Sequence, residues 1–98
     1  MEIKKTGNGN AVTLELTGRL DTTTAPQLEA ELKGCMGNVD ALTLDFEKLD
    51  YISSAGLRVL LATQKVMGEK GGLKICHVCP EIMEVFEITG FSDILTIE

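Results

Sequence analysis

Hydrophobic and polar residues alternate in several short stretches of the chain, which is the pattern of β-strands that bury one face. This pattern predicts strands at residues 1–6, 11–17, 41–46, 73–78 and 94–97. Residues 7–10, Gly-Asn-Gly-Asn, form a turn-rich link between the first two of these segments. We therefore expect those two strands to pair as an antiparallel hairpin.

Apolar residues recur at helical spacing in the intervening segments. They predict helices that run from Thr24 to Gly34, from Ser54 to Met67 and from Pro80 to Gly90. Thr24 and Gln27 have the spacing of a capping box at the first helix start, and glycines at 34, 68 and 90 are suited to end the three helices. The middle helix is apolar around most of its circumference, so we expect it to be largely buried.

Strands that alternate with helices after an N-terminal hairpin indicate an α/β fold. We expect a mixed β-sheet with α-helices packed on it, turns near 37–38 and 68–72, and right-handed crossovers between parallel strands. The 98 residues have the size of one domain, which we expect to span 1–98.

The charge of the chain narrows the classes of partner. Asp and Glu number 15 against 9 Lys and Arg, so the formal net charge is −6 at pH 7. This balance does not favour a nucleic-acid backbone or an anionic membrane, which leaves a protein as the expected partner. No apolar leader follows the first residues and no segment is long enough to span a bilayer, so we expect a cytoplasmic protein.

The cysteines predict neither disulfides nor a metal site. Cys35, Cys76 and Cys79 are odd in number and follow no secretion signal, so we expect reduced thiols. Cys76 and Cys79 have the two-residue spacing of zinc and redox motifs, but a structural zinc site takes four ligands and no second pair exists. His77 belongs to no pattern of a general base, and we expect a solvated residue at a strand end. We therefore predict no metal and no cofactor.

Two serines stand where the strand that starts near 41 gives way to the middle helix. Either Ser53 or Ser54 is suited to be the N-cap, a position at which serine commonly has only a structural role. A helix start also presents free backbone N–H groups and partial positive charge, so it tolerates a phosphate on a serine placed there. Gly56, in the first turn, allows either another backbone or a partner surface to come close.

The segment 51–61, YISSAGLRVLL, is similar to the signature of STAS domains of the bacterial anti-sigma factor antagonist type. Residues 16–21, LTGRLD, resemble the family's L-x-G-x-L-D element, and a threonine-rich helix entry follows them. The second half of the chain also resembles the family in four features. These are the glycine turn at 71–72, the strand at 73–76, the helix entry at Pro80 and the ending at 86–91, FEITGF. The resemblance spans essentially the whole chain and implies a STAS-like fold.

The resemblance assigns the family's phosphorylated serine to Ser54, two residues before Gly56. Ser53 falls where some members carry aspartate and is the less favoured acceptor. Asp21 matches a family loop residue close to that serine, although its local sequence equally fits a turn residue that bonds nearby N–H groups. The expected partner surface comprises Asp21, Thr22, Thr23, Ser53, Ser54, Ala55, Gly56 and Arg58.

The function that the resemblance implies is that of an anti-sigma factor antagonist. The unmodified domain would bind an anti-sigma factor, a serine kinase of the GHKL type, and so free a sigma factor for transcription. Phosphorylation would release the domain, and a PP2C-type phosphatase would restore it. The chain would be no enzyme, since it shows no catalytic triad, metal set or phosphate-binding glycine loop. The alternative is a STAS-like docking subunit of a membrane transport complex, in which the serine would be structural.

Overall fold

The computed structural model describes residues 1–35, 37, 39–68 and 72–98. Five strands in this part of the chain form one sheet in the order β1-β2-β3-β4-β5. They are β1 (Glu2–Asn8), β2 (Ala11–Leu20), β3 (Ala41–Ile52), β4 (Leu73–Cys76) and β5 (Thr96–Ile97). β1 and β2 pair antiparallel and the other neighbours pair parallel, which confirms the predicted hairpin and mixed sheet.

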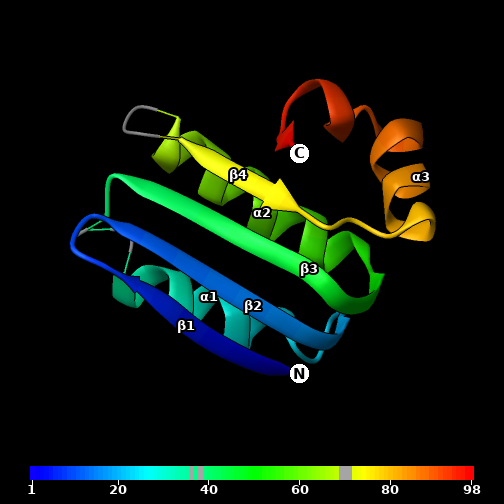
Figure 1. Ribbon diagram of the computed structural model, residues 1–98. Helices are drawn as coiled ribbons and strands as arrows, with labels where there is room; N and C mark the ends of the chain where they lie inside the picture. The colour runs from blue at the N-terminus through cyan, green and yellow to red at the C-terminus, as the bar shows by residue number, and fades with distance from the viewer. Residues whose placement is uncertain (36, 38, 69–71) are drawn as a thin grey trace.

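The helices are α1 (Ala25–Cys35), α2 (Ser54–Met67) and α3 (Pro80–Thr89), followed by the 3-10 turn η2 (Phe91–Asp93). Figure 1 shows α1 and α2 behind the sheet and α3 beyond the carboxyl end of β4. Phe86 attaches α3 to the sheet, because its buried ring lies 6.4 Å from that of Phe46 in β3, centroid to centroid. Among the described residues, no helix combines the length and the apolar character that crossing a bilayer requires.

The core lies between the sheet and the helices, because alternation places every second strand side chain on the helix side. Leu14 and Leu16 of β2 and Leu44 and Phe46 of β3 are fully buried there. The residues between them form the opposite, polar face of the sheet. Its half-buried members on β2 and β3 are Thr13, Glu15, Thr17, Thr43 and Asp45.

All five strands differ in their bounds from the predictions: β1 continues to Asn8 instead of ending at residue 6, and β5 covers only Thr96–Ile97 of the predicted 94–97. β2 continues past residue 17 to Leu20 and β3 past residue 46 to Ile52, because the two strands pair along this stretch and satisfy each other's backbone groups. Gly18, with φ of +106°, lies at a shift in their register and carries β2 through a break in the alternation. β4 ends at Cys76, before the predicted residue 78, since His77 takes a left-handed backbone conformation with φ of +57°.

The helices occupy their predicted places with two corrections. Gly34 does not stop α1, which continues to the buried Cys35. α2 buries one side only, and Val66 on its outer side is 43% exposed, because the sheet and α1 cover the rest of the helix but leave this side to water. The turns predicted at 37–38 and 68–72 include residues outside the described ones.

Candidate functional site

The parallel pairing of β2 and β3 brings the segments that follow both strands to one edge of the sheet. Leu20 and Ile52, the last residues of the two strands, are register partners. The backbone N–H of Ser53 donates a hydrogen bond to the carbonyl of Leu20 at 2.9 Å, which ties the start of α2 to the end of β2. Asp21 and Ser54 therefore belong to neighbouring segments at the carboxyl edge, where α/β proteins commonly place their sites.

Ser54 is the first residue of α2, and it is exposed. Ser53 occupies the N-cap position with extended backbone, at φ −104° and ψ 176°, but its hydroxyl makes no capping hydrogen bond. The Oγ of Ser53 is buried and has no hydrogen-bond partner within the described part of the chain. Of the two serines, Ser54 is the exposed residue, whereas the hydroxyl of Ser53 is buried. The start of α2 has no side-chain cap from Ser53, which suits it to stabilise an added negative charge.

Gly56 is buried in the first turn of α2, where the helix passes close to both strand ends. A Cβ at this position would lie 2.7 Å from Leu20 Cγ and 2.9 Å from Ile52 Cγ1, too close for carbon atoms. The glycine that we expected on the partner surface therefore acts from beneath it, by allowing α2 to approach the sheet. This packing leaves Ser54 and Arg58, one turn apart on the same side of α2, exposed.

Asp21 forms one half of a reciprocal capping box before α1. Its Oδ1 accepts hydrogen bonds from the backbone N–H groups of Thr23 and Thr24 at 3.0 and 3.1 Å. The N–H of Asp21 in turn donates to Thr24 Oγ1 at 2.9 Å. The hydrogen bond from the Thr24 backbone holds the pKa of the Asp21 carboxyl below its ordinary value. Asp21 thus has the turn-bonding role that its local sequence allowed.

This box corrects the prediction for the start of α1. The expected pair was Thr24 and Gln27, whereas the observed pair lies three residues earlier in the chain. The side-chain amide of Gln27 donates instead to the carbonyl of Met1 at 3.0 Å. The sequence spacing fits both pairs, but the side chain of Gln27 bonds Met1 and completes no box with Thr24.

A hollow of about 230 Å³ adjoins the site between the first turns of α1 and α2. Its lining residues are Thr22, Ala25, Pro26, Glu29, Ala55, Arg58 and Val59. Three of them, Thr22, Ala55 and Arg58, belong to the predicted partner surface, and Thr23 is exposed beside Thr22. The residues from α1 were missed, because the local sequence does not show which side of α1 faces α2.

Arg19 and Tyr51 add a cation and an aromatic ring to this edge of the sheet. The guanidinium of Arg19 lies 4.2 Å from the Tyr51 ring centroid, and Arg19 Nε lies 3.7 Å from Asp21 Oδ2. Arg19 and Tyr51 are register partners across β2 and β3. They were missed in the sequence, because their pairing depends on register shifts within the two strands. Both residue types are enriched at protein interfaces.

Comparison with known proteins decides the family. The family model of the STAS domain matches residues 2–98. The chain belongs to the STAS domain family. This STAS domain is 43% identical over 84 residues to BtrV of Bordetella bronchiseptica, a candidate anti-sigma factor antagonist, covering 84% of this chain and 72% of BtrV. It is 30% identical over 91 residues to the anti-sigma-B factor antagonist of Bacillus subtilis, covering 92% of this chain and 84% of that protein.

The fold of the STAS domain is also that of SpoIIAA, an anti-sigma factor antagonist and cell fate determinant of Bacillus. The TM-score is 0.77 to its unphosphorylated form and 0.76 to its phosphorylated form. Both matches cover 99% of this chain, with 87% and 91% of those chains covered and identities of 19% and 20%. At such identities the likeness concerns the fold, and it confirms the predicted α/β architecture.

Gly56→Ala tests the close approach of α2 to the sheet. The added methyl group collides with Leu20 and Ile52, so we expect the free energy of unfolding to fall by about 1–3 kcal/mol. The matched control is Gly34→Ala in α1, where nothing lies within 4 Å of the new Cβ and a gain of about 0.5–1 kcal/mol is expected. Urea unfolding measures both, and a neutral or stabilising Gly56→Ala would contradict the packing.

Asp21→Asn tests the charge of the capping box. Because the folded-state pKa of Asp21 is lowered, its charge stabilises the fold above the unfolded pKa of about 4, and this contribution is lost as the pH falls through the lowered pKa. We expect the variant to have a lower Tm than the wild type at neutral pH. This difference in Tm should disappear at acidic pH.

Thr24→Val provides the contrast to Asp21→Asn. It removes the hydroxyl that accepts from the Asp21 N–H and donates to the Arg19 carbonyl at 2.7 Å, so it should lower the Tm at every pH. Thermal unfolding across a pH series measures both variants. A gap between wild type and Asp21→Asn that did not vary with pH would argue against the role of the charge.

Proposed function

We propose that this STAS domain is a cytoplasmic anti-sigma factor antagonist controlled by phosphorylation of Ser54. In its unmodified state it binds a GHKL-type anti-sigma factor kinase and so frees a sigma factor for transcription. The kinase phosphorylates Ser54 and the domain is released, and a PP2C-type phosphatase reverses the modification. The chain is a binder and a substrate, and the ATP chemistry belongs to the kinase.

The observation that carries this proposal is that Ser54, the first residue of α2, is exposed. The neighbouring Ser53 has a buried hydroxyl, so of the two serines at this helix start Ser54 is the better acceptor. The two named sequence relatives are anti-sigma factor antagonists, one of them a candidate, and they support the partner class. SpoIIAA supports the switch, because that protein keeps this fold in both its phosphorylated and its unphosphorylated form.

A phosphate on Ser54 would change the contact surface more than the fold. A phosphoserine adds about −1.5 to −2 charges at neutral pH, and the backbone N–H groups at a helix start favour negative charge. A partner packed over Ser54 would bury that charge without a matching group, at a cost of several kcal/mol. About 3–4 kcal/mol corresponds to a 100- to 1,000-fold loss of affinity.

The contact surface that we propose surrounds Ser54 at the carboxyl edge of β2 and β3. Its members are Asp21, Thr22, Thr23, Ser54, Ala55 and Arg58. Two further residues of the predicted set act from beneath this surface. Ser53 fixes the start of α2 through its hydrogen bond to Leu20, and Gly56 allows the helix to lie close to the strand ends.

Phosphorylation of the purified chain tests the site directly. Incubation with the GHKL-type anti-sigma factor kinase of the same organism and ATP should add the mass of one phosphate to the wild type. Ser54→Ala should gain none, because it lacks the acceptor hydroxyl. Ser53→Ala is the matched control and should be modified like the wild type, since the hydroxyl that it loses is buried. Intact-mass spectrometry reads all three, and modification of Ser54→Ala would refute the site.

Replacement of Ser54 by a permanent charge tests the switch. Ser54→Asp should weaken binding to the kinase by about 100-fold or more, while Ser54→Ala should still bind. Calorimetric titration measures the affinities, and circular dichroism should show the wild-type spectrum for both variants. Equal affinity of Ser54→Asp and the wild type would reject the switch and favour constitutive docking, as in a transport complex.

A further inference from the structure

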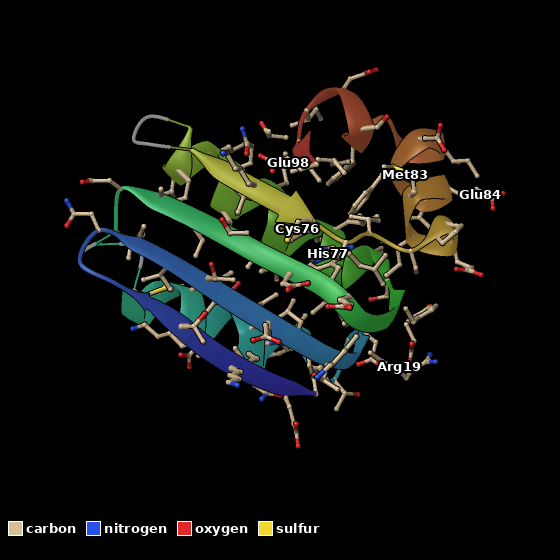
Figure 2. The ribbon with its side chains drawn as sticks, in the orientation of Figure 1. Arg19, Cys76, His77, Met83, Glu84 and Glu98 are labelled. Atoms are coloured by element: carbon tan, nitrogen blue, oxygen red, sulfur yellow. The ribbon has the colours of Figure 1, made fainter. Side chains whose placement is uncertain are left out.

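Three side chains with different metal-binding donor atoms meet on the polar face of the sheet. Asp45 of β3 and Cys76 of β4 are register partners across the parallel pair, and His77 follows at the end of β4. One carboxylate oxygen, one thiol sulfur and one imidazole nitrogen from these residues all lie within 4.8 Å of one another. Figure 2 shows Cys76 and His77 together at the carboxyl end of β4.

The backbone of His77 brings its ring to this cluster. Its φ of +57° lies in the left-handed region, which glycine adopts at lower cost than any other residue. In this conformation the chain turns away from β4, and His77 Nδ1 lies 2.9 Å from Asp45 Oδ1. The strained position is therefore used to hold an imidazole against a carboxylate of the neighbouring strand.

Charges of both signs surround the cluster, since Glu47 and Lys48 lie near it and Glu98 is paired with Lys74, Oε1 to Nζ, at 3.2 Å. The backbone N–H of Glu47 donates to Asp45 Oδ1 at 3.0 Å and so orients the carboxylate. Burial, together with the charges of Asp45, Glu98 and Glu47, raises the pKa of the Cys76 thiol. Such a setting disfavours a free thiolate nucleophile. A metal ion that coordinates sulfur stabilises the thiolate directly.

We propose that Asp45, Cys76 and His77 form a binding site for a divalent transition metal ion, with Zn²⁺ as the best match. Zn²⁺ binds carboxylate oxygen, thiolate sulfur and imidazole nitrogen, at about 2.0–2.3 Å and in tetrahedral geometry. The thiolate and imidazole donors select against Mg²⁺ and Ca²⁺, which prefer oxygen alone. Binding replaces the S–H bond, and any N–H bond at the coordinating nitrogen, by bonds to the metal and releases those protons to solvent.

Three protein ligands leave the fourth position of a tetrahedral site to water or to a side chain of a partner. The site draws on none of the residues around Ser54, so it stands or falls independently of the proposed switch. It also departs from the prediction of no metal, which rested on the absence of a second ligand pair beside Cys76 and Cys79. Cys79 instead is the N-cap residue before α3, and its Sγ lies 3.9 Å from the carbonyl oxygen of Leu49.

Titration of the full, reduced chain with Co²⁺ tests the site, because cobalt replaces zinc and reports a bound thiolate by a charge-transfer absorption band. We expect one equivalent of Co²⁺ to produce the band and Zn²⁺ to abolish it. Cys76→Ser should lack the band, and Asp45→Asn should lower the affinity by at least about 10- to 100-fold. The matched control is Cys79→Ser, which removes a thiol outside the cluster and should bind Co²⁺ like the wild type.

His77→Gly separates metal binding from folding. Glycine suits the left-handed conformation, so the metal-free Tm should hold or rise, while added Zn²⁺ should no longer raise it as it does for the wild type. The proposal is overturned if the wild type shows no charge-transfer band, if Cys76→Ser retains it, or if Cys79→Ser loses it. An equal rise in Tm with Zn²⁺ for His77→Gly and the wild type would also overturn it.

Discussion

The close approach of α2 to the paired ends of β2 and β3 is the constraint on which the candidate site depends. Gly56 makes it possible, because the positions of Leu20 and Ile52 leave no room for a Cβ. The hydrogen bond from Ser53 to Leu20 fixes the start of the helix at the same point. Both contacts exist only because β2 and β3 run parallel and end together, so sheet topology determines where Ser54 reaches solvent.

The two helix starts at this edge are stabilised in different ways. The turn before α1 is closed by the reciprocal hydrogen bonds of Asp21 and Thr24, which hold the loop in one conformation. The start of α2 has no side-chain cap from Ser53, and Ser54 stands there exposed. A loop closed by its own hydrogen bonds, beside a helix start that favours negative charge, suits a surface whose charge changes on modification.

The same parallel topology also produces the cluster on the polar face. Pairing of β3 with β4 sets Asp45 opposite Cys76, and the left-handed turn after β4 brings in His77. The helices bury the other face of the sheet. Side chains on the polar face therefore do not pack in the core and can be polar or charged. The sheet thus offers two separate places for chemistry, one at its carboxyl edge and one on its uncovered strands.

Periodicity and turn residues in the sequence determined how strands and helices succeed one another along the chain. They also determined the N-terminal hairpin and the bounds of α2. The resemblance of residues 51–61 and 16–21 to a known family located the serine and the loop beside it. Local patterns indicate the type and the approximate bounds of an element, and the hairpin and α2 depend mainly on such local patterns.

Only the tertiary structure decided which residues from distant segments meet. The register between strands sets the lengths of β2 and β3, the pairing of Arg19 with Tyr51 and the meeting of Asp45 with His77. Register is set by the packing of the whole sheet against its helices, and a pattern within one segment carries no information about the residue that will lie opposite it.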